Sequence, residues 1–450
     1  MNVPRIRLDV PIRGSFNLRR FSTSAVLVVG SALVANVFSY VFHFVLSRKL
    51  GPDQYGTLAT MMVVGGIFGV LGSSVGTVAM QEAARMWSAH LDDLIPQFVR
   101  KTGKFVLGFA AIVAIALVVV SVPLGAYLHV VKATIWLTVA TWVALTLLEL
   151  YARGSAQGAH RFAIFSASTL SEGILKVVLA VTFVLAGYGV GGALGGLLCA
   201  TLIGLLVAAV PMSLGGRHED QHVPEHLRLG GDALRVLAIN VAASALLFID
   251  LLFAKHHLSG AAAGYFGAAG TVAKTIPYSV GLIALILMPA AAAARHSSRE
   301  SLRHILLVAT LLAGCAIAVA LAIIVLFPQQ LIGITYGQRF SGAIPLLRLY
   351  AIDEALLALW AIASSYLIAI GQYRLFSYLS AAVVVEAGCM ALFGSTPVRL
   401  LTIAIAVNAL LVPAVWALAL RSLRALPQAA NPPAAETNNE PSSAKGPEFV

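Results

Sequence analysis

The sequence predicts an all-α integral membrane protein with about twelve transmembrane helices. Apolar stretches of roughly twenty residues follow one another from Ala25 to Leu420, with only short polar breaks between them. A run of ~18 or more apolar residues with few charges is long enough to cross a bilayer as a helix. The composition agrees, because 59% of the residues are hydrophobic, 11% are charged and the mean hydropathy is +0.89. The function must therefore lie inside a membrane.

The polar breaks divide the apolar region into twelve spans. Their ends carry an error of about 2–4 residues, because boundaries are the least certain part of a sequence-based assignment. We predict the spans at 22–47, 55–79, 104–129, 133–152, 162–186, 190–213, 233–256, 262–290, 303–327, 343–370, 373–394 and 398–420.

The basic residues between the spans predict the orientation, since cytoplasmic loops carry an excess of Lys and Arg. Of the 30 Lys and Arg residues, 21 fall on the side of the N terminus and six on the opposite side. The other three, Lys176, Lys274 and Arg348, fall within spans. We therefore expect both termini in the cytoplasm, which requires an even number of spans.

The spans and loops predict five regions. Residues 1–21 form a basic cytoplasmic N terminus, 22–213 a first lobe of six helices, 214–232 a cytoplasmic linker and 233–420 a second lobe of six helices. Residues 421–450 form a cytoplasmic tail that is rich in Pro, Ala, Asn, Ser and Glu. We expect this tail to be disordered, because it cannot bury enough apolar surface to fold.

Two short matches indicate that the lobes are repeats. The segments 50–56 and 258–264 each begin with Leu and end with Gly, at an offset of 208 residues. The segments 158–161 and 371–374 each begin with Gly and end with Arg, at an offset of 213 residues. A repeat of six spans keeps both halves in the same orientation, so a pseudo-two-fold axis along the membrane normal should relate the lobes.

The residues at these turns resemble a known family. LSRKLGPDQYGTLAT, after the first span, resembles the signature of the polysaccharide biosynthesis (oligosaccharide or O-antigen) flippases of the multidrug/oligosaccharidyl-lipid/polysaccharide exporter superfamily. Four further segments fit the pattern in the same order: FIDLLFAKHHLSGAAAGYFGAAG, LILMPA, ITYGQRFSGAIPLLRLYA and IAIGQYRLF. The resemblance runs from about Phe21 to Leu420.

The resemblance implies a fold and a function. Proteins of this family have two six-helix lobes arranged as a V around a central cavity. They move polyprenyl-diphosphate-linked oligosaccharides from the cytoplasmic to the periplasmic leaflet by alternating access, for O-antigen (lipopolysaccharide), capsule or exopolysaccharide assembly. The resemblance thus implies a transporter, not an enzyme, in a bacterial cytoplasmic (inner) membrane.

The implied partners are the lipid-linked oligosaccharide and the phospholipid bilayer. A glycan polymerase and glycosyltransferases of the same pathway are further candidate partners. We expect no nucleic-acid partner, because the net charge of +11 comes from basic residues in loops, where topology explains them.

Three basic residues within spans are candidates for substrate binding, because an ionisable group at membrane depth costs ~2.5–3.5 kcal/mol on insertion scales. Lys176 and Lys274 lie near the midplane of opposite lobes, where a diphosphate headgroup would need cationic partners. Lys274 has no acidic residue three or four positions away. Lys176 has Glu172 four residues earlier, so a structural pair is an equal alternative there. Arg348, near a periplasmic helix end, is explained equally well by snorkelling.

Acidic residues and one histidine form a second set of candidates. Asp250 lies in a span with small polar residues and is a candidate cavity residue. Asp353 and Glu354 are neighbours about 100° apart on one helix, so they cannot share a site. For this pair, ion coupling and satisfied packing contacts both remain open, and we favour packing contacts. Glu149 is expected at an interface, and His43 is expected to be a hydrogen-bonded interior residue.

Three alternatives to a flippase remain open, one of them a scaffold without transport, which would need no charged residue at the midplane. A multidrug cation antiporter of the same superfamily would favour an acidic, aromatic cavity, whereas the midplane lysines favour an anionic cargo. A membrane glycan polymerase or ligase would carry catalytic groups on a large periplasmic loop, but the longest such break, 328–342, has no acidic residue. The three cysteines lie within spans without metal-ligand spacing, so we expect no metal site. We also expect no catalytic residue and no cofactor.

Overall fold

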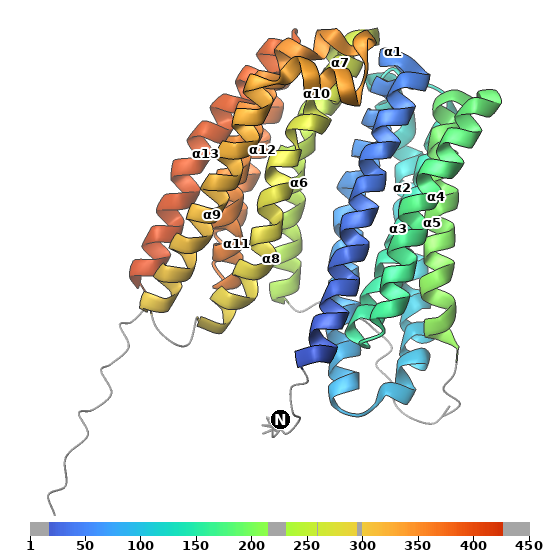
Figure 1. Ribbon diagram of the computed structural model, residues 1–450, viewed down its shortest axis with the longest axis vertical. Helices are drawn as coiled ribbons and strands as arrows, with labels where there is room; N and C mark the ends of the chain where they lie inside the picture. Colours follow the sequence, from blue (N-terminus) through green and yellow to red (C-terminus); the bar gives the residue numbers. More distant parts are fainter. Residues whose placement is uncertain (1–17, 215–230, 259, 295–298, 426–450) are drawn as a thin grey trace, which may run out of the picture.

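The computed structural model describes residues 18–214, 231–258, 260–294 and 299–425. All regular structure in these residues is helical, and the helices form two lobes that lean together as a V (Figure 1). The expected all-α fold with two six-helix lobes is confirmed. Residues 1–17, 215–230 and 426–450, which make up most of the expected N-terminal region, linker and tail, lie outside the described residues.

The first lobe is built from α1 (Leu18–Ser88), α2 (Ile95–Tyr127), α3 (Ala133–Gly158), α4 (Phe162–Phe183) and α5 (Gly189–Ser213). α1 holds two spans, because the chain turns at Gly51, where φ is +73° and ψ is 174°. A positive φ suits glycine, and Pro52 is tolerated at the start of the second half as in the first turn of a helix. A short 3-10 turn, η1 (Asp92–Leu94), precedes α2, and a π-helical segment, η2 (Val184–Tyr188), joins α4 to α5.

The second lobe is built from α6 (Gly231–His257), α7 (Gly260–Ala273), α8 (Thr275–Ala294), α9 (Arg299–Leu326), α10 (Pro328–Thr335), η3 (Gln338–Ala343), α11 (Ile344–Ala369), α12 (Leu375–Phe393) and α13 (Pro397–Ala425). α7 and α8 form one span that is interrupted at Lys274. Pro277 explains the interruption, because it has no N–H for the Ala273 carbonyl and its ring crowds that carbonyl.

Every predicted span corresponds to a helix. Within the described residues, eight continuous helical stretches are long and apolar enough to cross a membrane, and two of them, Leu27–Ser88 and Phe162–Ser213, each hold two spans. The remaining two spans are α7 with α8, and α11. Several boundaries need correction: the second half of α1 runs to Ser88, beyond the predicted 79, and α2 begins at Ile95, before the predicted 104. α1 also begins at Leu18, and α13 runs to Ala425, into the predicted tail. The last turn of α13 is helical because Leu423 is buried against the lobe.

The lobes meet at one end, which we call the closed end. It contains the turn of α1 at Gly51 together with α7 and α10 (Figure 1). The Arg48 guanidinium of α1 donates to carbonyls at the end of α10, among them Thr335 O at 2.7 Å. Tyr55 OH of α1 lies 3.1 Å from Tyr336 OH. The lobes diverge at the opposite end, the open end, where α1 begins and α13 ends (Figure 1).

The pseudo-two-fold axis passes through the closed end. Gly56 and Gly264, the residues matched at an offset of 208, touch each other there. A Cβ on Gly56 would lie 2.8 Å from Gly264 N, and a Cβ on Gly264 would lie 1.9 Å from Pro52 O. A residue contacts its own equivalent only where a two-fold axis passes close by. The segments that match as repeats in the sequence, 50–56 and 258–264, therefore also contact each other where the lobes join.

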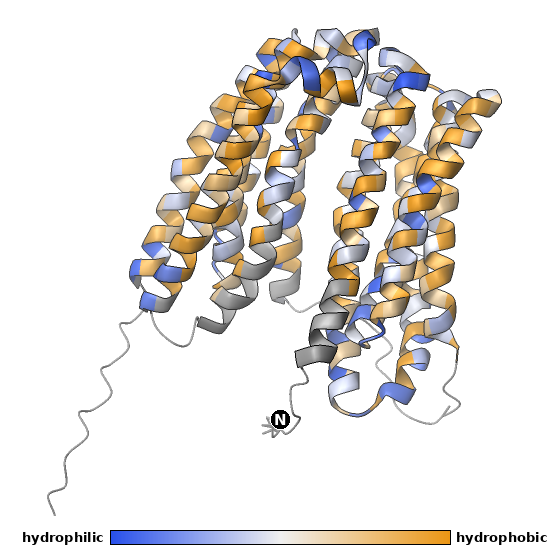
Figure 2. Ribbon diagram, viewed as in Figure 1, coloured by the Kyte–Doolittle hydropathy of each residue, from blue (hydrophilic) through white to orange (hydrophobic). Residues whose placement is uncertain are grey.

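The outer faces of both lobes are suited to lipid. Figure 2 shows hydrophobic residues along the outer faces of the helices and hydrophilic residues concentrated towards the helix ends. An apolar surface this continuous is unusual for a soluble monomer and marks contact with a membrane. Its exposed side chains include Ile112, Val119, Val122, Leu311, Val384 and Leu410.

Candidate functional site

A cavity of about 270 Å³ lies between the lobes, next to the contact that joins them. We call it the closed-side cavity. It is enclosed by α1 from the first lobe and by α6, α7, α8 and α11 from the second. Its polar lining groups are His43, Thr271, Lys274, Tyr278 and Tyr350.

A second cavity of about 400 Å³ lies one to two helical turns nearer the open end. We call it the open-side cavity, and α1, α6, α8 and α11 line it again. Its α1 residues fall between 70 and 77, whereas those of the closed-side cavity fall between 43 and 66. Tyr278 lines both cavities, so the two are neighbours along the groove between the lobes.

Lys274 lies in the wall of the closed-side cavity, at the break between α7 and α8. Its Nζ donates to Glu354 Oε1 at 2.9 Å and lies 3.9 Å from Asp250 Oδ2. The ammonium also lies 5.0 Å from the centre of the Tyr350 ring, whose hydroxyl donates to Asp250 Oδ2. Lys274 is therefore an ion-paired cation, and Glu354 takes one of its three N–H donors.

Asp353 and Glu354 have separate partners on different helices. Glu354 pairs with Lys274, whereas Asp353 Oδ1 accepts from Asn408 Nδ2 of α13 at 2.9 Å. Asn408 Oδ1 in turn accepts from Trp360 Nε1 at 2.9 Å. Because neighbours on a helix point about 100° apart, the two carboxyl groups reach different partners. They tie α11 to the α7–α8 break and to α13.

Several oxygens of this buried group have no hydrogen-bond partner among the described residues. They are Asp250 Oδ1, Glu354 Oε2 and both carboxyl oxygens of Glu386 on α12. Glu386 is fully buried, although the sequence assigned it no role. The second lobe thus concentrates carboxyl groups around one ammonium.

His43 connects the cavity to the closed end. Its Nδ1 lies 2.8 Å from Tyr55 OH, and Tyr55 OH lies 3.1 Å from Tyr336 OH on the other lobe. This chain of side chains crosses the interface beside the Gly56 contact. His43 is a hydrogen-bonded interior residue that also lines the closed-side cavity.

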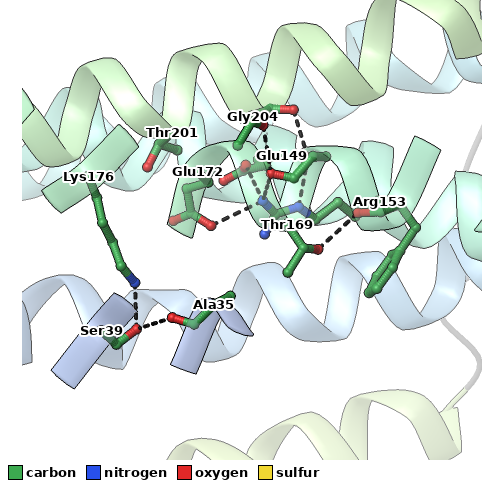
Figure 3. A network of polar contacts seen from close by, with 12 residues as sticks. Ala35, Ser39, Glu149, Arg153, Thr169, Glu172, Lys176, Thr201 and Gly204 are labelled. Atoms are coloured by element: carbon green, nitrogen blue, oxygen red, sulfur yellow. Dashed lines mark hydrogen bonds and ion pairs between the residues drawn. The ribbon is translucent and has the colours of Figure 1, made fainter. Parts of the chain in front are cut away.

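The first lobe has its own charged group, shown in Figure 3, with Arg153 at its centre. Arg153 Nη2 lies 2.7 Å from Glu149 Oε1 and 3.0 Å from Glu172 Oε2. Arg153 Nε also donates to Ser168 Oγ at 2.8 Å. One guanidinium from α3 therefore holds two carboxylates, one of them on α4.

Lys176 points away from this group, towards α1 (Figure 3). Its Nζ donates to Ser39 Oγ at 2.6 Å, while Glu172 is bound to Arg153. Lys176 lines neither of the two inter-lobe cavities, and neither does Arg348, which is exposed near the start of α11. The structure therefore brings Lys274, Asp250 and Glu354 together at one site and leaves Lys176 and Arg348 apart from it.

Two residues of the first lobe were wrongly placed from the sequence. Arg153 was counted as a loop residue and Glu149 was expected at an interface, but both are buried within α3. Both can be buried because they pair with each other. Without Arg153, the side of the N terminus holds 20 Lys and Arg residues and the opposite side holds six. The spacing of four residues between them was the available signal. Tyr350 and Asn408 carried no comparable signal, since their partners come from other helices.

The chain has the fold of known transporters. It matches the inward-facing conformation of a multidrug resistance MATE family transporter of the MOP superfamily with a TM-score of 0.69 and 16% identity, over 89% of this chain and 98% of the other. The outward-facing conformation of such a transporter matches with a TM-score of 0.62 and 16% identity, over 90% and 96% of the two chains. A MOP superfamily transporter from Pyrococcus furiosus, described as having a binding pocket of reverse polarity, matches with a TM-score of 0.58 and 15% identity, over 90% and 96%.

A comparison with curated proteins gives no match. A family model described as polysaccharide biosynthesis protein, however, matches residues 45–345, which is more than half of the chain. The matched region begins before the turn at Gly51 and ends in α11, so it includes the contact that joins the lobes and most of the cavity wall. The chain belongs to the polysaccharide biosynthesis protein family.

Proposed function

We propose that the protein translocates a polyprenyl-diphosphate-linked oligosaccharide from the cytoplasmic to the periplasmic leaflet of a bacterial cytoplasmic membrane. The observation that carries this proposal is a cavity at membrane depth between two lobes that are joined at one end and apart at the other. Membership of the polysaccharide biosynthesis family supplies the substrate class. O-antigen, capsule or exopolysaccharide assembly would consume the product.

Alternating access is the mechanism that such an architecture supports. The glycan would enter the groove from the open end, and the lobes would then close at that end. At the closed end, the contact of Arg48 with α10 and the contact of Tyr55 with Tyr336 would be released. The lipid tail would stay in the bilayer, where the apolar outer faces of the lobes meet it. The Gly56–Gly264 contact lies near the pseudo-two-fold axis and is suited to act as a pivot.

Lys274 is the residue we propose for the diphosphate. It lies in the wall of the closed-side cavity, and two of its N–H donors remain beside the one that Glu354 accepts. A diphosphate oxygen would take up these donors, and the ion pair with Glu354 would keep the ammonium in place until the substrate arrives. Lys176 and Arg348 are weaker candidates, because in this conformation they lie outside both cavities.

Deleting the gene tests the proposed function directly. The expected result is loss of the surface glycan and accumulation of lipid-linked oligosaccharide in the cytoplasmic leaflet, with both restored by the wild-type gene. Unchanged surface glycan and unchanged lipid-linked oligosaccharide in the deletion strain would contradict the proposal.

A second candidate is a multidrug cation antiporter. The carboxyl groups of Asp250 and Glu354, buried behind the wall of the closed-side cavity, outnumber the ammonium of Lys274, and the ring of Tyr350 lines the cavity itself. This chemistry is suited to an organic cation. Efflux of a fluorescent cation from energised vesicles distinguishes the two. Efflux that depends on the protein would favour the antiporter, and its absence together with glycan accumulation would favour the flippase.

A further inference from the structure

We propose that the open-side cavity is a subsite for uncharged sugar residues of the cargo, separate from the charged groups around Lys274. This inference rests on the proposed function and adds which part of the substrate the cavity binds and of what chemistry. The observation that supports this proposal is a set of neutral polar side chains from α1, α6 and α11 that surround one space of about 400 Å³. That volume falls within the ~300–1,000 Å³ of typical small-ligand sites.

The cavity contains no charged side chain among the described residues that line it. Its polar groups are hydroxyls, one amide and one phenol, from Ser73, Ser74, Thr77, Asn240, Ser244, Tyr278, Ser364 and Ser365. A diphosphate needs cations and an organic cation needs carboxylates, so neither is matched by this lining. A neutral polyol is matched, because it brings many hydroxyl groups and no charge.

Most hydroxyls of the cavity are arranged to accept hydrogen bonds. Ser73, Ser74, Thr77 and Ser365 each donate their O–H to the carbonyl four residues earlier, at 2.8–3.1 Å. Their lone pairs remain available, since a hydroxyl has one donor and two acceptor positions. The ligand must therefore supply donors, as sugar hydroxyls do.

Three further side chains have no hydrogen-bond partner among the described residues. Ser364 is a lining residue that is only 6% exposed, and its Oγ is buried just behind the cavity surface with no partner. Asn240 and Ser244 on α6 line the same space, and their side chains make no hydrogen bond to the described part of the chain. A buried polar group without a partner costs ~1–3 kcal/mol, so a ligand that reaches Ser364 recovers that free energy.

An aromatic ring completes the subsite. Tyr278 is 55% exposed and lies where the two cavities meet, so its face is open to the apolar C–H side of a sugar ring. Trp360 lines the cavity as well, but it is buried and its Nε1–H is taken by Asn408. Tyr278 therefore lies between the glycan subsite and Lys274, at the position where the first sugar would follow the diphosphate.

The experiment compares three probes bound to the full-length protein in detergent, with dissociation constants from native mass spectrometry. The probes are a polyprenyl diphosphate, the same lipid carrying a neutral disaccharide, and the same lipid with one sugar replaced by a hexuronic acid. The wild-type protein should bind the neutral glycolipid about tenfold more tightly than the bare lipid, as one or two net hydrogen bonds allow. The acidic glycolipid should bind no more tightly than the bare lipid.

The variant is Ser364→Ala combined with Asn240→Leu. Neither side chain has a partner to lose, so folding should not suffer. The tenfold gain from the neutral disaccharide should disappear, while binding of the bare lipid stays unchanged. Thr182→Val is the matched control, because this exposed hydroxyl of α4 lies outside both cavities and should keep the full gain.

Each outcome bears on one of the two proposals. Three outcomes would overturn the subsite while leaving the flippase proposal intact. They are equal binding of bare lipid and neutral glycolipid by the wild type, tighter binding of the acidic glycolipid, and a full gain in the double variant. Failure of all three lipids to bind would count against the flippase proposal, and the subsite would fall with it.

Discussion

Lys274 shows what local sequence can and cannot say about a charged residue at membrane depth. Its depth was predictable from the length of the apolar stretch around it, and the absence of an acidic residue at helical spacing was correct. Its actual partner, Glu354, is 80 positions away, and Asp250 comes from a third helix. Helical spacing reports only contacts within one helix, so partners on other helices could not be predicted.

The pairing changes the expected behaviour of Lys274 variants. Lys274→Met should destabilise the protein, because removing one partner of a buried ion pair costs ~3–5 kcal/mol. Adding Glu354→Gln should recover most of that loss, which thermal unfolding in detergent would measure. If the ammonium also binds the diphosphate, the stable double variant should still fail to export glycan, whereas Lys274→Arg should export in part. Full export by the double variant would limit Lys274 to a structural role.

Glu386 allows a complementary test, because its carboxyl group is buried without a hydrogen-bond partner in the described chain. Glu386→Gln replaces the ionisable carboxyl group with a neutral amide at nearly constant volume. We expect an unchanged melting temperature or a rise of up to ~3 °C, since the carboxyl group has no hydrogen bond to lose and the amide cannot carry a buried charge. Export should be unchanged as well. A stable Glu386→Gln protein that no longer exports glycan would instead assign this carboxyl group to the transport cycle.

At the scale of elements, the turn that ends α3 shows how a correct match can have the wrong register. Arg161 N donates to Ala156 O at 2.9 Å, and Gln372 N donates to Leu367 O at 2.8 Å. The ends of α3 and α11 therefore correspond at an offset of 211 residues. Arg161 and Arg374, which cap the helices that follow, correspond at the predicted 213. The match of the two arginines is in register, whereas the match of Gly158 with Gly371 is two residues out.

The error arose because two glycines have different physical roles. Gly371 is in the turn and has a φ of +78°, whereas its equivalent is His160, with a φ of +57°. Gly158 lies inside α3, where a Cβ would be 2.1 Å from Met80 O, so it allows two helices to approach closely. Matching by residue type joined a packing glycine to a turn glycine, which only the backbone can separate.

The contact between α1 and α7 makes an element-scale prediction. Gly264→Ala should destabilise the closed end, because the new Cβ would lie 1.9 Å from Pro52 O and backbone cannot yield easily. We expect a lower melting temperature and a loss of glycan export at equal membrane levels.

Gly314→Ala in α9 is the matched control. No atom lies within 4 Å of its Cβ position, and alanine favours a helix by ~0.5–1 kcal/mol over glycine. This control should be as stable as the parent or more so, with normal export. Equal behaviour of the two variants would show that the lobes do not depend on close backbone contact at Gly264.

At the scale of the whole molecule, the number of spans and the two lobes were predictable, because both follow from hydrophobic length and from an even repeat. The end at which the lobes join was not predictable from periodicity. It depends on contacts such as those from Arg48 to the carbonyls of α10, made by residues 285–287 positions apart. The polarity of the cavities was equally hidden, since the lining of each is assembled from a few residues of four or five different helices.

The orientation in the membrane remains a prediction, and the structure makes its test specific. Five of the six basic residues expected outside, Arg48, Lys49, Lys132, Arg339 and Arg399, lie in or beside the turns of the closed end, and Lys255 lies in the last turn of α6 at that end. The closed end should therefore face the periplasm. After replacement of Cys199, Cys315 and Cys389, single cysteines are introduced at exposed positions of either end.

Cysteines at Asp53 and Gln338, both exposed at the closed end, should react with a membrane-impermeant reagent added to intact cells. A cysteine at Glu300, exposed at the start of α9 near the open end, should react only after the membrane is permeabilised. Labelling in detergent controls for the intrinsic reactivity of each site. Reaction at position 300 in intact cells, with none at 53 and 338, would invert the orientation. The V would then open towards the periplasm, and the open-side cavity would receive substrate from the wrong leaflet for the proposed export.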